Sequence, residues 1–342
     1  TGVQTCALPI SAEIGVEIKD SIEWIEAYNY IAKLMGIVKQ NSAAERLPLD
    51  QNMGKNTIPD ADQHNKRYIY IDPHLYDRND ADSGASLETK LYRSLIGKQL
   101  GNYKAVSFIG AGSMAGVFKG RDVVLERDVA LKVISYKLST IPSYRDMFVK
   151  EARLVSRLGH PNVAQIYHID HIDDVLYSVM ELISGGTLMD MIKDRNQLNL
   201  AKSLEYLITT CRTLDFVGKQ NIVHRNIKPT NIMINDRGML KITDFGVATA
   251  DDEANQKRNA DGFGSPLYAS PEYIIGRPLD CLSDMYSLGA TFYHVFAGVP
   301  PFEGDSFEAI TNKHLNEHLV PLKKKNPMVS VDLSDIIGQM KP

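Results

Sequence analysis

Cysteine and tryptophan are scarce in this sequence. Its three cysteines, Cys6, Cys211 and Cys281, lie far apart among 342 residues, and there is a single tryptophan. Such spacing fits neither a disulfide framework nor a metal-binding cluster. We therefore expect small buried thiols and a reducing, cytoplasmic environment.

Long apolar runs and an excess of basic charge are also missing. No run of about 18 or more apolar residues occurs, so the sequence predicts no membrane span within this chain. The net charge is −4, whereas nucleic-acid-binding surfaces are usually basic, so we expect no nucleic-acid partner. An apolar fraction of 44% is ordinary for a globular protein, and the length suggests two structural units.

The first part of the chain, residues 1–96, carries no chemical motif. Residues 1–10 (TGVQTCALPI) resemble translated sequencing-adapter read-through, and we treat them as a non-native segment. Apolar stripes over residues 14–38 predict a helix that belongs to an upstream domain or, alternatively, serves dimerisation or docking. The rest of residues 11–96 is predicted to be a polar linker with a short strand at 67–71 and a helix at 87–96.

The character of the sequence changes after Gly97. Alternating apolar patterns predict an antiparallel sheet, with strands at residues 103–109, 116–118, 129–134, 164–169 and 176–182. An amphipathic helix is predicted at residues 144–158, and the pattern beyond Gly186 is mostly helical. The sequence thus predicts an α+β fold, in which a small β lobe with one helix precedes a larger helical lobe.

A glycine-rich segment, residues 109–120 (IGAGSMAGVFKG), separates the first two strands. Gly110 and Gly112 allow backbone N–H groups to approach phosphate oxygens without a Cβ in the way. Ala115 occupies the third glycine position of the G-x-G-x-x-G pattern, and Gly116 follows it. Taken alone, a glycine-rich hairpin without a ligand is an equally good interpretation.

Lys132 lies in an otherwise apolar strand, residues 129–133 (VALKV), and Glu151 lies in the helix that follows. An ammonium group in such surroundings needs an anionic partner, because burying an unpaired charge is costly. We expect Glu151 to be that partner. The alternative, two unrelated surface charges, fits the apolar neighbours of Lys132 poorly.

Two further segments point to a family. Residues 222–234 (IVHRNIKPTNIMI) and 242–248 (ITDFGVA) resemble the catalytic loop and the DFG segment of protein kinases. The glycine loop, strand lysine, helix glutamate and an SPE segment at residues 270–272 follow in the family's order. The resemblance covers residues 97–342 and is closest to bacterial Ser/Thr kinases. It implies a bilobal protein-kinase-like fold whose large lobe is incomplete at the C-terminus.

The resemblance implies a role for each matching position. Lys132, held by Glu151, would grip the α- and β-phosphates of ATP, and Lys228 would steady the γ-phosphate. Asn231 and Asp244 would hold Mg²⁺ through oxygen ligands. The remaining contacts to ATP would come from the glycine loop, the sheet and the hinge, namely Ile109, Gly110, Gly112, Val117, Ala130, Met180, Glu181, Ile183 and Met233. A spine joining the lobes would comprise Val155, Ile166, His224 and Phe245, and Asp284 would tether the catalytic loop.

The resemblance also bears on the substrate. Lys228 and Ser265, in the segment GSPLY, are typical of Ser/Thr rather than Tyr kinases, which implies protein hydroxyls as acceptors. Small-molecule phosphotransferases that share the fold are the alternative, but the glycine loop, Lys228, the GSPLY segment and the SPE segment together favour protein substrates. Thr230 replaces an acidic residue that reads arginines in basophilic relatives, so we expect no strong preference for basic sites.

Asn226 occupies the position of the aspartate that accepts the substrate hydroxyl's proton. A carboxamide has no basic lone pair at neutral pH, and general-base assistance is typically worth ~10²–10⁴ in rate. We therefore expect weak transfer or none. Three explanations stay open: a pseudokinase acting as a nucleotide-binding switch or scaffold, an active kinase recorded with a one-base change, and a deliberate inactivating substitution.

Arg225 precedes this position, and in relatives with that arginine it reads a phosphate on the activation loop. Residues 250–264 contain no Ser, Thr or Tyr, so the usual acceptor is missing there. The acidic residues of this stretch could pair with Arg225 instead, and an incidental solvated loop is an equally good interpretation.

Overall fold

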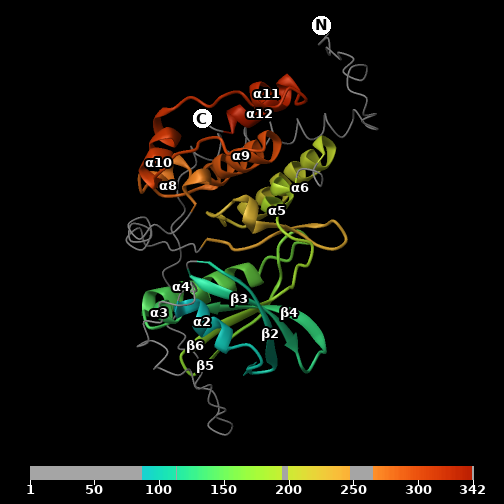
Figure 1. Ribbon diagram of the computed structural model, residues 1–342, viewed down its shortest axis with the longest axis vertical. Helices are drawn as coiled ribbons and strands as arrows, with labels where there is room; N and C mark the ends of the chain where they lie inside the picture. Colours follow the sequence, from blue (N-terminus) through green and yellow to red (C-terminus); the bar gives the residue numbers. More distant parts are fainter. Residues whose placement is uncertain (1–86, 113, 195–198, 247–264, 341–342) are drawn as a thin grey trace.

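The computed structural model describes residues 87–112, 114–194, 199–246 and 265–340. Residues 1–10 and the elements expected at 14–38 and 67–71 lie outside these ranges. The described residues form a sheet-containing lobe, at the bottom of Figure 1, and a helical lobe above it. This arrangement confirms the expected α+β bilobal fold. Within the described ranges, no helix is long and apolar enough to cross a membrane.

The small lobe is built on an antiparallel sheet with the strand order β1-β2-β3-β4-β6-β5. Its strands are β1 (Gln99–Leu100), β2 (Tyr103–Ala111), β3 (Ala115–Asp122), β4 (Arg127–Ile134), β5 (Ile166–Ile172) and β6 (Val175–Met180). Its helices are α2 (Leu87–Ser94), α3 (Tyr136–Ser139) and α4 (Pro142–Ser156). The predicted strands and helices are confirmed, with ends displaced by a few residues.

The two faces of this sheet pack against different helices, because successive side chains of a strand point to opposite sides. Phe118, Leu131 and Tyr177 join one buried cluster that also contains Tyr92 of α2. Ile134 belongs to a second cluster with Phe148 of α4. The sheet is therefore covered by α2 on one face and by α4 on the other.

The large lobe is mostly helical and contains one two-stranded ribbon. Its helices are α5 (Leu188–Lys193), α6 (Leu200–Lys219), α8 (Pro271–Ile274), α9 (Cys281–Ala297), α10 (Phe307–Asn316), α11 (Leu322–Lys325) and α12 (Val331–Gln339). The ribbon strands are β7 (Ile232–Ile234) and β8 (Leu240–Ile242), and short 3₁₀ turns form η3 (Pro229–Asn231) and η4 (Pro266–Tyr268).

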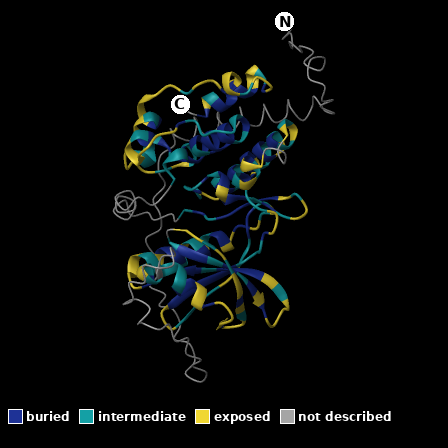
Figure 2. Ribbon diagram, in the orientation of Figure 1, coloured by how far each residue is buried: buried dark blue, intermediate teal, exposed yellow. Residues whose placement is uncertain are grey.

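Helix α9 is the central helix of this lobe and is largely buried, as its dark blue ribbon in Figure 2 shows. Asp280 begins it with a capping box, in which its carboxylate accepts from the N–H groups of Leu282 and Ser283. Gly298 ends it in the left-handed conformation, with φ of 74°. A helix that is capped at both ends and buried along its length holds its side chains in fixed positions, including the buried carboxylate of Asp284.

Candidate active site

Four of the predicted site residues share one face of the small-lobe sheet. Val117 pairs with Lys132 across β3 and β4, and Ala130 pairs with Met180 across β4 and β6. Directly paired residues point to the same side of a sheet, and so do residues two apart on one strand. The pattern therefore brings Val117, Ala130, Lys132 and Met180 together on the face opposite α2.

An ion-pair network, buried at Lys132 and Glu151 and partly exposed at Asp244, joins this face to the large lobe. Lys132 Nζ lies 2.9 Å from Glu151 Oε1 on α4 and 2.9 Å from Asp244 Oδ1, which follows β8. The Lys132 and Glu151 side chains are only 14% and 15% exposed, so their charges are largely removed from water. The contact predicted between Lys132 and Glu151 is confirmed.

The network sets the charge states of its members. Burial acts to lower the pKa of Lys132, but the carboxylates of Asp244 and Glu151 outweigh it, and the pKa is raised overall. Lys132 in turn lowers the pKa of Asp244. Lys132 and Asp244 are thus both charged near neutral pH.

The β7–β8 ribbon places the two predicted metal ligands side by side. Ile232 pairs with Ile242, so Asn231 and Thr243 lie opposite one another at the end of the ribbon, and the Thr243 N–H donates to the Asn231 carbonyl. Asp244 is the next residue and adopts φ of 55°. An amide oxygen and a carboxylate at one edge are hard oxygen donors that suit Mg²⁺. The residues present therefore fit this ion.

Asn226 belongs to the catalytic loop and contacts the segment that carries Asp244. Its Nδ2 donates to the Asp244 carbonyl over 3.4 Å, and its own carbonyl accepts from Asn231 Nδ2 at 2.8 Å. An aspartate at this position could not donate the first of these bonds. Lys228 lies on the same loop, and burial lowers its pKa while Asp244 acts in the opposite direction.

Asp284 of α9 holds the catalytic loop from below, as the sequence predicted. Its two carboxylate oxygens accept from the backbone N–H groups of His224 at 2.6 Å and Arg225 at 2.7 Å. Arg225 has φ of 67°, which is uncommon for a residue with a side chain. Burial raises the pKa of Asp284 to about 7, and the two N–H groups act against this shift. The Asp284 carboxylate thus stabilises a backbone conformation that Arg225 would rarely adopt by itself.

The predicted spine between the lobes also forms. His224 and Phe245 have ring centroids 4.3 Å apart, and Phe245 belongs to the same buried cluster as Val155 of α4. Ile166 of β5 packs against that cluster. The apolar contact therefore runs from the catalytic loop to the helix that carries Glu151.

The hinge between the lobes contains an ion pair that the sequence analysis missed. Lys241 Nζ of β8 lies 2.8 Å from the carboxylate of Glu181, and both side chains are mostly buried. The backbone N–H of Glu181 donates to the Gln165 carbonyl, so the Glu181 carbonyl is the backbone group of this residue that could contact adenine. Lys241 is a lysine in an apolar run, the same signal that identified Lys132. Ile183 and Met233 lie near this hinge, and Met233 forms a bridge with Thr187.

The glycine loop is the most exposed part of the site. Ile109 is 58% exposed beside a register irregularity in β2, and Gly110 still pairs with Val117. The N–H of Gly112 donates to the Ala115 carbonyl at 2.9 Å, so it closes the turn. The segment expected to pair with Arg225 lies outside the described residues.

A wide groove of about 760 Å³ opens beside Ser265 on the large lobe. Its walls come from α5, the η4 turn, the end of α9 and α10. They are mainly apolar, with Lys193 and Glu303 as charged groups. Beneath it, the Tyr268 hydroxyl lies 2.8 Å from His294 Nδ1, so the turn that carries Ser265 rests on the central helix.

Comparison with known proteins gives consistent results. Residues 103–340 match the model of the protein kinase domain family. The chain is 35% identical to the serine/threonine-protein kinase PrkC of Bacillus subtilis over 244 residues, which cover 71% of this chain and 38% of that protein. It is 34% identical to the serine/threonine-protein kinase PknB of Mycobacterium tuberculosis, over 69% of this chain and 38% of that protein.

Among solved structures, the kinase domain of Mycobacterium tuberculosis PknI is similar with a TM-score of 0.56 and 22% identity. The match covers 72% of this chain and 89% of that domain, and it supports the fold. The chain spans less than two fifths of the length of the curated relatives above.

Proposed function

The chain belongs to the protein kinase family, and from that premise we propose that it is a Ser/Thr kinase domain that binds ATP with Mg²⁺ and transfers phosphate to protein hydroxyls, at a rate lowered by Asn226. The observation that carries the proposal is the network in which the mostly buried Lys132 and Glu151 pair with each other and Lys132 also reaches the partly exposed Asp244. Three charges held together at the junction of the lobes are costly for a purely structural role, because hydrophobic residues would serve packing equally well.

In this proposal Lys132 binds the α- and β-phosphates, and Glu151 keeps its ammonium group in place. The raised pKa of Lys132 ensures that it is positive when it meets phosphate. Adenine lies against Val117, Ala130 and Met233, and the Glu181 carbonyl and Ile183 backbone provide its polar contacts. The glycine loop covers the phosphates through Gly110, and Ile109 closes the mouth of the site.

Asn231 and Asp244 are the residues that would hold Mg²⁺. When bound, the ion neutralises charge on the phosphates and so favours transfer. Lys228 adds a positive charge on the catalytic loop, where it steadies the γ-phosphate. The ribbon fixes Asn231 and Asp244 relative to each other, and the tether to Asp284 fixes the loop on which Lys228 lies.

Asn226 orients the substrate hydroxyl but cannot accept its proton. The expected loss is that of general-base assistance, ~10²–10⁴ in rate. Positioning by the rest of the site still leaves some transfer, because the transition state is loose.

The groove beside Ser265 is the surface that we assign to the protein substrate. It is open, mostly apolar and continuous with the turn 265–268, which suits an extended peptide better than a small metabolite. Thr230 adds no negative charge next to Asn231, so we propose no strong preference for basic sites. A peptide-array profile dominated by arginine would contradict this part of the proposal.

A second function, a nucleotide-binding switch or scaffold without transfer, is supported by one observation. The Asn226 carboxamide donates to the Asp244 carbonyl, a bond that ties the catalytic loop to the metal-binding segment and that an aspartate could not make. Such a bond favours a fixed nucleotide-binding shape over turnover.

The deciding experiment measures Mg-ATP affinity by calorimetry and transfer of labelled phosphate to a generic protein, for the chain and its Asn226→Asp variant. We expect both to bind Mg-ATP and the variant to transfer far faster. If both bind but neither transfers, the switch or scaffold function is correct. Equal activity in both would show that Asn226 does not limit the rate, and absence of Mg-ATP binding would refute both functions.

A further inference from the structure

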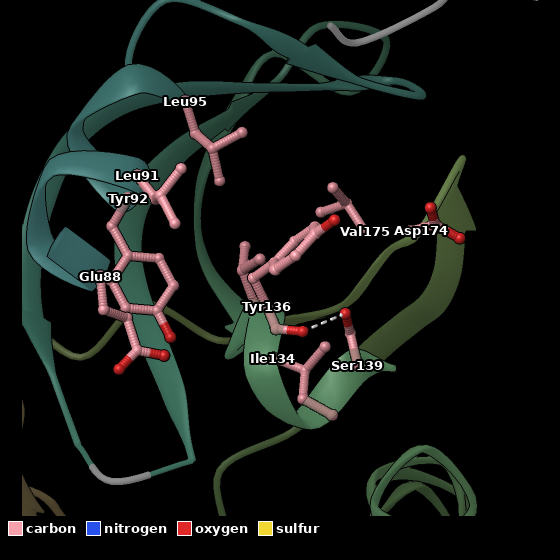
Figure 3. Close-up of a pocket in the computed structure, with 10 residues that line it drawn as sticks. Glu88, Leu91, Tyr92, Leu95, Ile134, Tyr136, Ser139, Asp174 and Val175 are labelled. Carbon is pink, nitrogen blue, oxygen red and sulfur yellow. Dashed lines mark hydrogen bonds between the residues drawn. The ribbon is translucent and has the colours of Figure 1, made fainter. Parts of the chain in front are cut away.

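Helix α2 precedes the family-matched residues 103–340, yet it is closely packed on the small-lobe sheet. Leu91, Tyr92 and Leu95 are buried, and Figure 3 shows them facing Tyr136 and Val175 across a narrow cavity. The cavity has a volume of about 20 Å³, roughly the space of one water. The helix therefore packs as part of the lobe, and the cavity is too small for a ligand.

Tyr92 contacts both strands that flank the glycine loop. Its ring stacks on Phe108 of β2 with centroids 5.8 Å apart, and it meets Phe118 of β3 edge-on at 6.1 Å. Phe108 and Phe118 also contact each other at 5.3 Å. Offset and edge-on contacts at such separations are favourable. The three rings thus tie α2 to the hairpin.

The same ring lies directly against the backbone of Gly116. A Cβ at this position would come within 2.8 Å of two carbons of the Tyr92 ring, so no other residue fits without displacing it. Gly116 pairs with Ala111, the last pair before the loop turns. The close approach gives a physical reason for a glycine at position 116, beside the Ala115 that departs from the usual pattern.

Tyr92 stands behind the loop, on the side away from the nucleotide. Gly116 and Phe118 face α2, whereas Val117, between them, pairs with Lys132 on the cleft face. At its first turn α2 makes a second contact, in which the Ser135 hydroxyl donates to Glu88. Ser135 directly follows β4, the strand of Lys132. The helix therefore fixes the hairpin relative to the strand that carries the phosphate-binding lysine.

We propose that Tyr92 is a positioning residue of the nucleotide site, which holds the glycine hairpin at the distance from Lys132 that the ATP phosphates require. The proposal rests on the ATP binding proposed above. Without the ring, the backbone at Gly116 has no support from behind and the loop can move away from the phosphates. Most of the proposed adenine contacts come from β4, β7 and the hinge, which Tyr92 does not touch, and only Val117 lies on the hairpin itself. Phosphate recognition should therefore suffer much more than adenine recognition.

The test compares the affinities of Mg-ATP and adenosine for the full chain by calorimetry. We expect Tyr92→Ala to bind Mg-ATP about tenfold more weakly, about 1.4 kcal/mol, with a clearly smaller loss of adenosine affinity. Tyr92→Phe keeps the ring and should leave the ratio of the two affinities unchanged. Equal losses for both ligands, or no loss for either, would overturn the proposal.

A second pair of variants keeps the test valid if Tyr92→Ala is too unstable to study. Gly116→Ala pushes against the ring and should cause the same selective loss of Mg-ATP affinity. In the double variant with Tyr92→Ala the two losses should not add, because the same contact is removed. Additive losses would refute the proposed contact.

Two controls separate positioning from general stability. Leu95→Ala removes a buried side chain from the same cavity without touching Gly116, so it should lower the melting temperature and leave the ratio of the two affinities unchanged. Gly120 lies on the same strand as Gly116, but a Cβ there would clash with Leu131 instead of Tyr92. The effect of Gly120→Ala on Mg-ATP affinity should therefore be the same with and without Tyr92→Ala. If the unaltered chain binds no Mg-ATP, the proposed function fails as well; a Tyr92→Ala variant with an unchanged ratio refutes only this inference.

Discussion

The two sides of the cleft between the lobes are built differently. On the small-lobe side, Lys132 and Glu151 are buried charges that pair with each other, and Lys132 also reaches Asp244. On the catalytic-loop side, the central side chain is the neutral carboxamide of Asn226, which makes one long hydrogen bond. The side that would grip the nucleotide is complete, whereas the side that would accept a proton is not.

In the proposed function, nucleotide binding and phosphate transfer therefore make separate demands on the fold. A buried charge must keep its partner, because an unpaired one costs several kcal/mol of stability. A neutral amide in place of a carboxylate imposes no such cost, and Asn226 retains bonds to both neighbouring segments. One position can therefore lose its chemistry while the network beside it stays intact.

The largest effect should come from restoring the proton acceptor. Asn226→Asp should raise phosphate transfer by ~10²–10⁴, measured with labelled ATP. Adding Glu151→Gln to this variant should cancel most of the gain, because Lys132 then loses its partner on the small lobe. An unchanged gain in the double variant would show that the two sides work independently.

Removing Asp244 tests the intact side. Asp244→Ala should weaken Mg-ATP binding by about 100-fold, the upper range for residues that support a bound metal, since it also takes one partner from Lys132. Adenosine affinity should stay the same. Asp335→Ala, an exposed acid on α12, is the matched control and should change neither affinity.

On the catalytic-loop side, a change at Asp284 should lower the stability of the folded chain. Asp284→Asn leaves one acceptor oxygen for two backbone N–H groups, and we expect a loss of about 2 kcal/mol in the free energy of unfolding by urea. The same exchange at Asp280 should cost little, because asparagine also caps helices well. Equal losses at both positions would contradict the tethering role.

The smallest expected effect is on pH dependence in the large lobe. Burial lowers the pKa of His294 from 6.5 to about 4. Between these two pH values the histidine is protonated in the unfolded chain but neutral in the folded chain. This part of the stability is present above pH 6.5 and is lost as the pH falls toward 4. Urea unfolding at a series of pH values should show that His294→Gln reduces the slope by about 1 kcal/mol per pH unit. An unchanged slope would contradict the assignment.

Much of the site was predictable because its residues carry local signals. Lys132 stands out in an apolar strand, the glycine loop lies at a strand turn, and residues 222–248 hold two motifs at a fixed separation. Their contacts with Glu151 and Asp284 followed from those signals and the family resemblance. Lys241 gave the same signal as Lys132 and was overlooked, since its partner Glu181 lies far away in sequence.

Other features depend on packing that no local pattern contains. The predicted helix at 87–96 carries no motif, and only the three-dimensional structure shows Tyr92 against Gly116. Likewise, the donor role of the Asn226 amide depends on where the Asp244 carbonyl lies, which β8 and the tether at Asp284 decide together.

The β7–β8 ribbon has a mechanical consequence. Both candidate metal ligands are attached to it and belong to one lobe, whereas Lys132 arrives from the other on β4. If the lobes rock about the hinge, the spacing between Asn231 and Asp244 stays constant, and the separation of Lys132 from Asp244 changes. Opening of the lobes would thus change the ion-pair distance but leave the spacing of the two candidate metal ligands unchanged. A spectroscopic label on each lobe would therefore report opening without disturbing the metal-binding edge.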